Sequence, residues 1–479
     1  MAHNDSLAKG VVKFSISTWV NLIVGFFSVV ITTRIITPSD YGMITLFITA
    51  SALLLYLLTL GLDSAFIRYY NEPPVGNTNN QLLYKSLSFS TLLCLLVGGV
   101  TIVFFSKEAS VIIFGIESRL LISLLLIYSL SQVWLRYLNI SFRMSFRAKQ
   151  YNIQNILINC LTRVLIILSA FFSSGYMFII SILTIGITAT LFVYLIVQRE
   201  EIKPYNATRY LDYSLRISNM SSYFRFAFFS APTYIVVYFN TFMAQQIIRE
   251  EIDTYALGVF ASTSMLVSVL TALKGGFATY WSAYVYKNYS NEQAKISLMH
   301  DYIVVFSILI SSLIVIFRDV IYLFIGQNYH SSKVFFSLIL ILPILNFIRE
   351  TTDKGIEISN RNEISLTAHA VAVFVNLGLC YLLIPILGIT GAAVANAISA
   401  ITLFIITAIY GQKFYRSIND YFKTAKGVFL LLLILTIPSL TGNMLLICFL
   451  VICLDVMGLV LYREEVKQML LILKSYKKG

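Results

Sequence analysis

The sequence contains little charge. Charged residues make up only 12% of the 479 residues, whereas apolar residues make up 58%. A soluble domain has roughly 25% charged and roughly 45–50% apolar residues. This composition excludes an ordinary soluble protein and predicts a polytopic membrane protein.

The residues of common catalytic and metal sites are also scarce. Five cysteines all fall inside apolar segments without CxxC or paired spacing, which argues against a disulfide framework or a metal knuckle. The four histidines are scattered and form no HExxH motif, and no Walker A loop is present. We therefore expect no metal, no cofactor, no direct use of ATP and no enzymatic activity.

Long apolar segments cover most of the chain. A helix needs about 20 apolar residues to cross a bilayer. The sequence predicts an all-α protein with fourteen transmembrane helices, at 11–33, 41–62, 82–105, 119–141, 152–173, 176–198, 223–247, 254–276, 300–317, 333–350, 363–385, 389–411, 426–441 and 443–461. The segment 319–326 is expected to continue or flank the ninth. The first run is too long for a cleaved signal peptide.

The basic residues predict the orientation. Most of the 35 Lys and Arg residues lie in the terminal segments and the even-numbered loops. Such a skew places both termini in the cytoplasm, and it explains the net charge of +12 without nucleic acid. The predicted location is the bacterial cytoplasmic (inner) membrane.

The spans predict two lobes of six helices. A charged stretch near the middle of the chain acts as a linker, and the last two spans have no counterpart. The predicted divisions are an N-terminal lobe at 1–198, a cytoplasmic linker at 199–222, a C-terminal lobe at 223–411 and two extra helices with a cytoplasmic tail at 412–479.

A weak internal repeat supports the two lobes. RIITPSDYGMITLF at 34–47 resembles QIIREEIDTYALGVF at 246–260, since both have Ile-Ile, a polar turn, Asp, Tyr and Gly before an apolar helix. Repeated halves are common in secondary transporters, in which the substrate site lies between them.

Four cations lie within or at the edge of apolar segments: Arg34, Arg136, Arg163 and Lys274. A charge at bilayer depth costs roughly 2.5–3.5 kcal/mol on insertion scales unless it faces a protein or water-filled interior. One hypothesis is that they line a hydrated cavity, in which the planar arginine guanidinium groups bind phosphate oxygens. The alternative is a structural salt bridge with Asp63 or with the acidic cluster that begins at Glu350.

The position of each cation distinguishes their roles. Arg34 lies in an outer turn, where a structural or gating role is as reasonable as ligand contact. Lys274 lies towards the cytoplasmic end of its span and can snorkel. Arg136 and Arg163, on adjacent spans, are the favoured anion ligands.

Polar residues follow single faces of several spans at helical spacing. They are candidates for lining a cavity or for joining helices to one another. The cavity candidates are Asn21, Gln132, Asn139, Asn155, Asn159 and Thr271. Asp63 and Asp455 are candidate coupling residues, although a capped structural role suits Asp455 equally. The charged face that begins at Glu350 is expected to be solvated or to lie between the halves.

Three stretches resemble the oligosaccharide flippases (Wzx-type) of the multidrug/oligosaccharidyl-lipid/polysaccharide (MOP) exporter superfamily. They are TTRIITPSDYGMITLF at 32–47, LGLDSAFIRYYNE at 60–72 and NLGLCYLLIPILGITGAAVANAIS at 376–399. The resemblance implies two six-helix lobes around a cavity that opens alternately to each side. It also implies cavity cations that hold a diphosphate-sugar head, and Arg34 and Lys274 occupy suitable positions.

The implied function is translocation of undecaprenyl-diphosphate-linked oligosaccharide repeat units for O-antigen (lipopolysaccharide), capsule or exopolysaccharide biosynthesis. Implied partners are membrane lipids, a polysaccharide polymerase and chain-length proteins; the chain is expected to be a monomer. The first span lacks the arginines of peptidoglycan-precursor flippases, and the interiors of spans one, seven and eight lack the acids of many multidrug antiporters. The alternatives are a multidrug or small-solute antiporter and a membrane-embedded polymerase or ligase. The sugars and the coupling ion are not indicated by the sequence.

Overall fold

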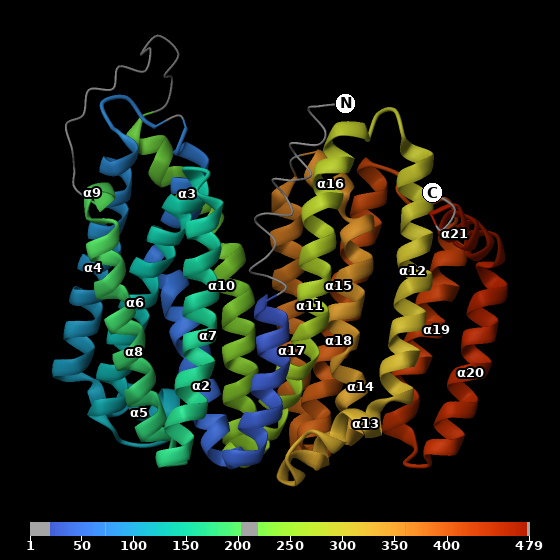
Figure 1. Cartoon of the computed structure of the whole chain (residues 1–479), viewed down its shortest axis with the longest axis horizontal. Coiled ribbons are helices and arrows are strands. Elements are labelled where there is room, and N and C mark those ends of the chain that lie inside the picture. Colours follow the sequence, from blue (N-terminus) through green and yellow to red (C-terminus); the bar gives the residue numbers. More distant parts are fainter. Residues whose placement is uncertain (1–19, 72, 203–218, 360, 477–479) are drawn as a thin grey trace. The chain divides into compact units, whose positions relative to one another are not determined.

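Helices make up the regular structure of the described residues, which are 20–71, 73–202, 219–359 and 361–476 of a computed structural model. The chain divides into two compact units, Met1–Gly258 and Val259–Gly479. Within each unit the long helices run roughly alongside one another (Figure 1). The predicted all-α class is confirmed. The beginning of the first predicted span and most of the predicted linker lie outside the described residues.

The first unit contains the N-terminal helices. They are Val20–Ile35, α2 (Pro38–Thr59), α3 (Leu62–Tyr69), α4 (Asn79–Phe104), α5 (Ser106–Phe114), α6 (Arg119–Met144), α7 (Ala148–Phe172), α8 (Tyr176–Val197), α9 (Arg199–Ile202) and α10 (Met220–Glu251). α11 (Thr254–Asn288) begins in this unit and continues into the second.

The second unit contains the remaining helices. They are α12 (Gln293–Ile316), α13 (Arg318–Leu323), the 3₁₀ helix η2 (Gln327–Val334), α14 (Phe336–Ile339), α15 (Ile341–Thr352), α16 (Lys354–Ile358), α17 (Asn362–Leu387), α18 (Ile389–Phe414), α19 (Tyr421–Leu440), α20 (Met444–Leu461) and α21 (Arg463–Tyr476). α17 and α18 form a close hairpin at Gly388, whose φ of 58° suits glycine.

Twelve helices of the described residues are long and apolar enough to cross a membrane. Two predicted spans differ from this pattern. The tenth, 333–350, falls on a pair bent by 70° at the junction of Gln327–Val334 with Phe336–Thr352, where the polar sequence of η2 precedes the apolar run. The first is described only as the shorter apolar helix Val20–Ile35.

The motif at 34–47 has a clear local structure. The Thr37 hydroxyl caps α2 by accepting a hydrogen bond from the Asp40 N–H at 3.2 Å, and Pro38 occupies the first turn, where its missing donor costs nothing. The Asp40 carboxylate accepts the Tyr176 N–H at 2.9 Å, which ties the start of α8 to α2. A Cβ at Gly42 would lie 2.3 Å from the Thr254 carbonyl, so glycine permits this close approach.

A break separates α2 from α3 and positions a functional carboxylate. Leu60 and Gly61 both have positive φ, at 43° and 76°. A Cβ at Gly61 would lie 2.2 Å from the Ala227 carbonyl, so α10 packs directly against the break. The new helix start places Asp63 in the first turn of α3.

α10 belongs to the first unit because it packs along α2 and α3. The compact unit that contains α10 ends at Gly258. The predicted linker at 199–222 and the lobe at 223–411 stay predictions.

Candidate functional site

Arg136 on α6 is paired with Asp63 on α3. Its Nε and Nη2 donate to the same carboxylate oxygen, Asp63 Oδ2, at 2.8 and 2.6 Å. Asp63 is buried, with 1% of its side chain exposed, whereas Arg136 is 32% exposed. The structure therefore shows a salt bridge with Asp63, which was the alternative to an anion-binding role for Arg136. The pair as a whole carries no net charge.

Three tyrosines surround this pair. Tyr56 on α2 stacks on Tyr238 and Tyr234 of α10, with ring centroids 4.5 and 5.4 Å apart. The Arg136 guanidinium carbon lies 5.0 Å from the Tyr56 ring centre, within cation–π range. Tyr234 and Tyr238 share one face of α10 because they are four residues apart. The result is a polar and aromatic cluster on four helices of the first unit, α2, α3, α6 and α10.

Arg163 on α7 has a different environment. Its Nη1 donates to the Gly25 carbonyl at 3.4 Å, and a Cβ at Gly25 would contact the guanidinium at 3.3 Å. Glycine at this point of the helix Val20–Ile35 thus makes room for the arginine. No carboxylate among the described residues forms an ion pair with Arg163. The half-buried guanidinium near the middle of this spanning helix therefore has a backbone carbonyl as its hydrogen-bond partner, and no carboxylate of the described residues pairs with it.

The other polar candidates of the first unit bond either to a second helix or within their own helix. Asn139 Nδ2 donates to the Tyr151 carbonyl and to the Gln154 side chain, at 3.3 and 3.1 Å, and so links α6 to α7. Gln132 donates to the Tyr128 hydroxyl within α6, at 3.0 Å. The Asn139 contacts match the helix-joining interpretation of the polar stripes.

Four further candidates lie on α7 and on the helix Val20–Ile35. Asn159 Nδ2 donates to the Asn155 backbone and side-chain oxygens, at 2.8 and 2.9 Å. The Asn21 side-chain oxygen is buried and accepts no hydrogen bond from the described residues. Arg34 is exposed at the end of the helix Val20–Ile35, where a cation complements the helix dipole.

Lys274 of the second unit belongs to an ion-pair network. Its Nζ lies 3.3 Å from Glu350 on α15. Glu350 also receives Lys354 Nζ of α16 at 2.7 Å, and the same ammonium reaches Glu357 at 2.8 Å. The charged face was expected to be solvated or to lie between the halves. Lys354 is only 1% exposed, whereas Glu357 is 38% exposed, so the face is buried around its lysine and partly open at Glu357.

The electrostatics of this network favour its charged form. Burial opposes the charge on Lys354, but Glu350 and Glu357 outweigh it and raise the pKa of the ammonium above its usual value. The Ser282 hydroxyl of α11 is a further partner of Lys354 at 3.2 Å. The Trp281 indole N–H donates to the Glu350 carbonyl at 3.2 Å. The network therefore fastens α11 to α15 and α16.

Two other candidates of the second unit have simpler surroundings. Thr271 is exposed on α11. Asp455 on α20 accepts the Ser312 hydroxyl of α12 at 2.6 Å, which is the structural alternative considered for this carboxylate. Among the described residues, no group of three His, Cys, Asp or Glu side chains is arranged to hold a metal ion.

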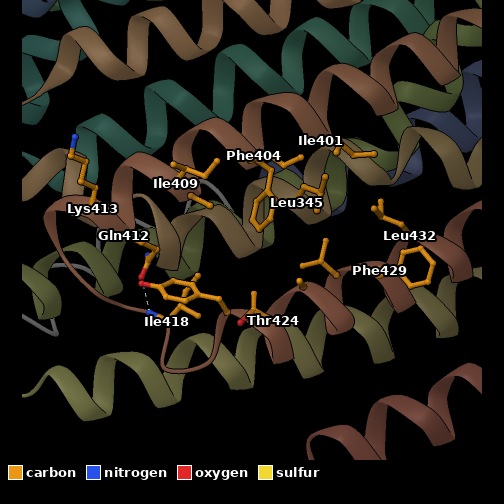
Figure 2. Close-up of a pocket in the computed structure, with 15 residues that line it drawn as sticks. Leu345, Ile401, Phe404, Ile409, Gln412, Lys413, Ile418, Thr424, Phe429 and Leu432 are labelled. Atoms are coloured by element: carbon orange, nitrogen blue, oxygen red, sulfur yellow. Dashed lines mark hydrogen bonds between the residues drawn. The ribbon is translucent and has the colours of Figure 1, made fainter.

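An apolar groove of about 630 Å³ opens between α15, α18 and α19 (Figure 2). Its walls are aliphatic and aromatic, including Leu345, Phe404 and Leu432. Gln412 and Lys413 lie at one end (Figure 2). The groove has the dimensions and chemistry to accept an alkyl chain with a polar group at that end.

Sequence reasoning did not bring the tyrosines together with the Arg136–Asp63 pair. Tyr56, Tyr234 and Tyr238 were recognised only as members of polar stripes, on segments far apart in the chain. The four-residue spacing of Tyr234 and Tyr238 was the sequence feature that could have predicted the stack. Two tyrosines on one face of a spanning helix can contact the same neighbouring side chain. The burial of Lys354 was also missed.

Solved structures similar to this chain are membrane transporters. The lipid II flippase MurJ in an inward closed conformation matches with a TM-score of 0.69 and 17% identity, over 95% of this chain and 99% of that one. Inward-facing and outward-facing multidrug resistance MATE transporters of the MOP superfamily match with TM-scores of 0.56 and 0.54, at 15% and 14% identity. Each covers 85% of this chain, and 97% and 95% of its own. No protein-family model and no curated relative matches the sequence.

These likenesses establish the fold. The chain is a multi-pass membrane protein with the helical architecture that the lipid II flippase shares with MATE transporters. The predicted MATE-like fold class is therefore confirmed.

Proposed function

We propose that this protein is a flippase that moves undecaprenyl-diphosphate-linked oligosaccharide repeat units across the bacterial cytoplasmic membrane. The observation that carries the proposal is Arg163, a cation within a spanning helix whose one hydrogen bond goes to the Gly25 carbonyl. A charge at this depth is costly unless it faces the protein or a water-filled interior, and such charges often mark a substrate or ion pathway. The fold shared with a lipid II flippase supports a lipid-linked substrate.

The diphosphate is assigned chiefly to Arg163. Its planar fork suits phosphate oxygens, and no ion pair with the described residues competes for it. Arg136 is a weaker anion ligand because Asp63 already neutralises it. Lys274 likewise shares Glu350 with Lys354, so we assign it a supporting role. Arg34 is kept as a gating candidate.

The apolar groove of the second unit supports an amphiphilic substrate. Its walls suit an isoprenoid chain, and the polar residues Gln412 and Lys413 lie at one end. Such a lipid enters the protein with its head, while the tail remains in an apolar environment. Alternating access then moves the head between the two leaflets.

The proposed role belongs to the synthesis of O-antigen, capsule or exopolysaccharide, with a polymerase and chain-length proteins as partners that use the exported unit. Asp63 and Asp455 remain coupling candidates, each already engaged by a neighbour, Arg136 and Ser312 respectively.

A multidrug or small-solute antiporter is the second candidate. The fold shared with MATE transporters favours it. A polymerase or ligase has less support, since the similar structures are transporters rather than enzymes.

The test compares Arg163→Glu with Arg163→Lys in a strain that lacks the wild-type protein. Charge reversal should abolish surface polysaccharide while the protein remains in the membrane, and Arg163→Lys should retain part of the export because the positive charge stays. Normal export by Arg163→Glu would refute the anion site. Altered drug susceptibility of the deletion strain with intact polysaccharide would favour the antiporter.

A further inference from the structure

The tyrosine stack beside Arg136 has an open end. Tyr56 is enclosed by its neighbours, with the guanidinium at 5.0 Å and the rings of Tyr238 and Tyr234 at 4.5 and 5.4 Å. Tyr234, by contrast, is 44% exposed. The stack therefore ends in a ring with a free surface, held in place by rings behind it.

The guanidinium beside the stack retains donors. Both of its hydrogen bonds to Asp63 use Nε and Nη2, and Nη1 donates to none of the described residues. Because Arg136 is one-third exposed within a spanning helix, its open edge is expected to face water or a polar ligand rather than lipid. The Tyr56 ring thus has two neighbours that can meet a ligand, the stacked ring of Tyr234 and a guanidinium with an unused donor.

This combination distinguishes one class of ligand. A phosphate gains little here, since the Arg136–Asp63 pair is neutral overall. A sugar ring is also neutral, and its C–H face packs on the electron-rich face of an aromatic ring. Its hydroxyl groups accept hydrogen bonds of the kind that the free edge of Arg136 can donate.

We propose that Tyr234, supported by Tyr56 and Tyr238, forms a saccharide subsite, in which a sugar ring stacks on Tyr234 and a hydroxyl group accepts a hydrogen bond from Arg136. This inference rests on the proposed flippase function and assigns a second part of the substrate. Arg163 holds the diphosphate, and the tyrosine stack binds a sugar.

The experiment measures binding of two lipids to the purified full-length protein. One probe is undecaprenyl diphosphate, which carries no sugar. The other is the undecaprenyl-diphosphate oligosaccharide extracted from a strain that lacks this protein. Tyr234→Leu removes the ring and Tyr234→Phe keeps it. Tyr84→Leu is the matched control, because Tyr84 is an equally exposed tyrosine of the same unit, at 45%.

Tyr234→Leu should weaken binding of the oligosaccharide lipid by about tenfold, the change that roughly 1.4 kcal/mol makes, and leave binding of undecaprenyl diphosphate unchanged. Tyr234→Phe and Tyr84→Leu should bind both lipids as the wild type does. Arg163→Gln should weaken both lipids, because it removes the diphosphate contact.

Three results would overturn the subsite while leaving the flippase intact. The first is an equal loss of binding of both lipids in Tyr234→Leu. The second is no loss of binding in that variant. The third is a loss of oligosaccharide-lipid binding in Tyr234→Phe as large as in Tyr234→Leu. If Tyr234→Leu instead abolishes binding of ethidium without affecting the oligosaccharide lipid, the stack serves an aromatic cation and the saccharide assignment is wrong. A wild-type protein that binds neither lipid would refute the flippase proposal together with the subsite.

Discussion

The two units differ in how the cations in and beside their spanning helices are paired. In the first unit two arginines lie on adjacent spanning helices, and Asp63 pairs with only Arg136. In the second unit Lys274 and Lys354 are matched by Glu350 and Glu357 in one connected network. One unit thus presents a surplus positive charge, while the other balances its charges internally.

This contrast indicates what each set of charges does. A balanced, buried network fixes helices relative to one another, but it offers little to an anion because its donors are already engaged. A cation opposed only by a carbonyl dipole contributes little to folding and remains available to a ligand. Substitutions that separate stability from transport can therefore test the comparison.

The largest loss of stability is expected for Glu350→Gln. This change leaves Lys274 without its carboxylate and leaves Lys354, which is 1% exposed, with Glu357 alone. Removing one partner of a buried ion pair costs about 3 kcal/mol or more. We expect a clearly lower unfolding temperature of the detergent-purified protein, measured by intrinsic fluorescence.

Glu357→Gln is the matched control for this network, because Glu357 is 38% exposed and water can replace much of what it provides. It should lower the unfolding temperature far less. Equal effects of the two variants would show that burial does not set the strength of this network.

A smaller loss of stability is expected for Asp63→Asn. Hydrogen bonds to charged groups contribute about 1.5–3 kcal/mol, and the exposed part of Arg136 reduces the effect in this case. The variant also leaves a second unpaired arginine in the first unit, so its affinity for undecaprenyl diphosphate should rise. Unfolding temperature and lipid binding measure the two effects.

The double variant Asp63→Asn/Arg136→Gln completes this test. Since it removes both charges, it should recover part of the lost stability and lose the gain in lipid affinity. Effects of the two single substitutions that simply add would contradict a direct pairing.

The spanning helices were largely predictable, because apolar run length alone locates them. The pattern also predicted the helix start at Thr37 and Pro38, where the cap and the proline are local features. It did not predict the bend at η2. There an apolar run joins a polar 3₁₀ helix, and packing rather than composition decides the angle.

The candidate cations could be located in the sequence, but their environments could not be distinguished. Arg136 and Asp63 are 73 residues apart, and only the break at Gly61 and the packing of α10 bring Asp63 to α6. Arg163 looked equivalent to Arg136 in sequence, since both lie on polar faces of adjacent spans. They differ because Asp63 contacts Arg136 and not Arg163 in the folded chain. Spacing along one helix cannot predict such a contact between helices.

A still smaller effect on stability is expected for Arg163→Gln, although transport should fail. Because no ion pair with the described residues is lost, the free energy of unfolding should change by no more than about 0.5 kcal/mol. Surface polysaccharide should nevertheless be lost, and the two measurements together separate this residue from Glu350. A large fall in unfolding temperature would place Arg163 among the structural cations instead.

The smallest effect on stability is expected for Asp420, an exposed charge of the second unit. It serves as the reference for a weakly stabilising charge. Its carboxylate caps α19 by accepting the Lys423 and Phe422 N–H groups at 3.0 and 2.8 Å, and these bonds hold its pKa below the usual value. The depressed pKa means that the cap stabilises the fold at neutral pH and loses that contribution as pH falls through the lowered pKa. Asp420→Asn keeps the capping oxygen but cannot titrate, so its unfolding temperature should fall less than that of the wild type when the pH drops below about 3.9, the ordinary aspartate value. Parallel pH profiles for the two proteins would show that the charge on this cap contributes nothing measurable.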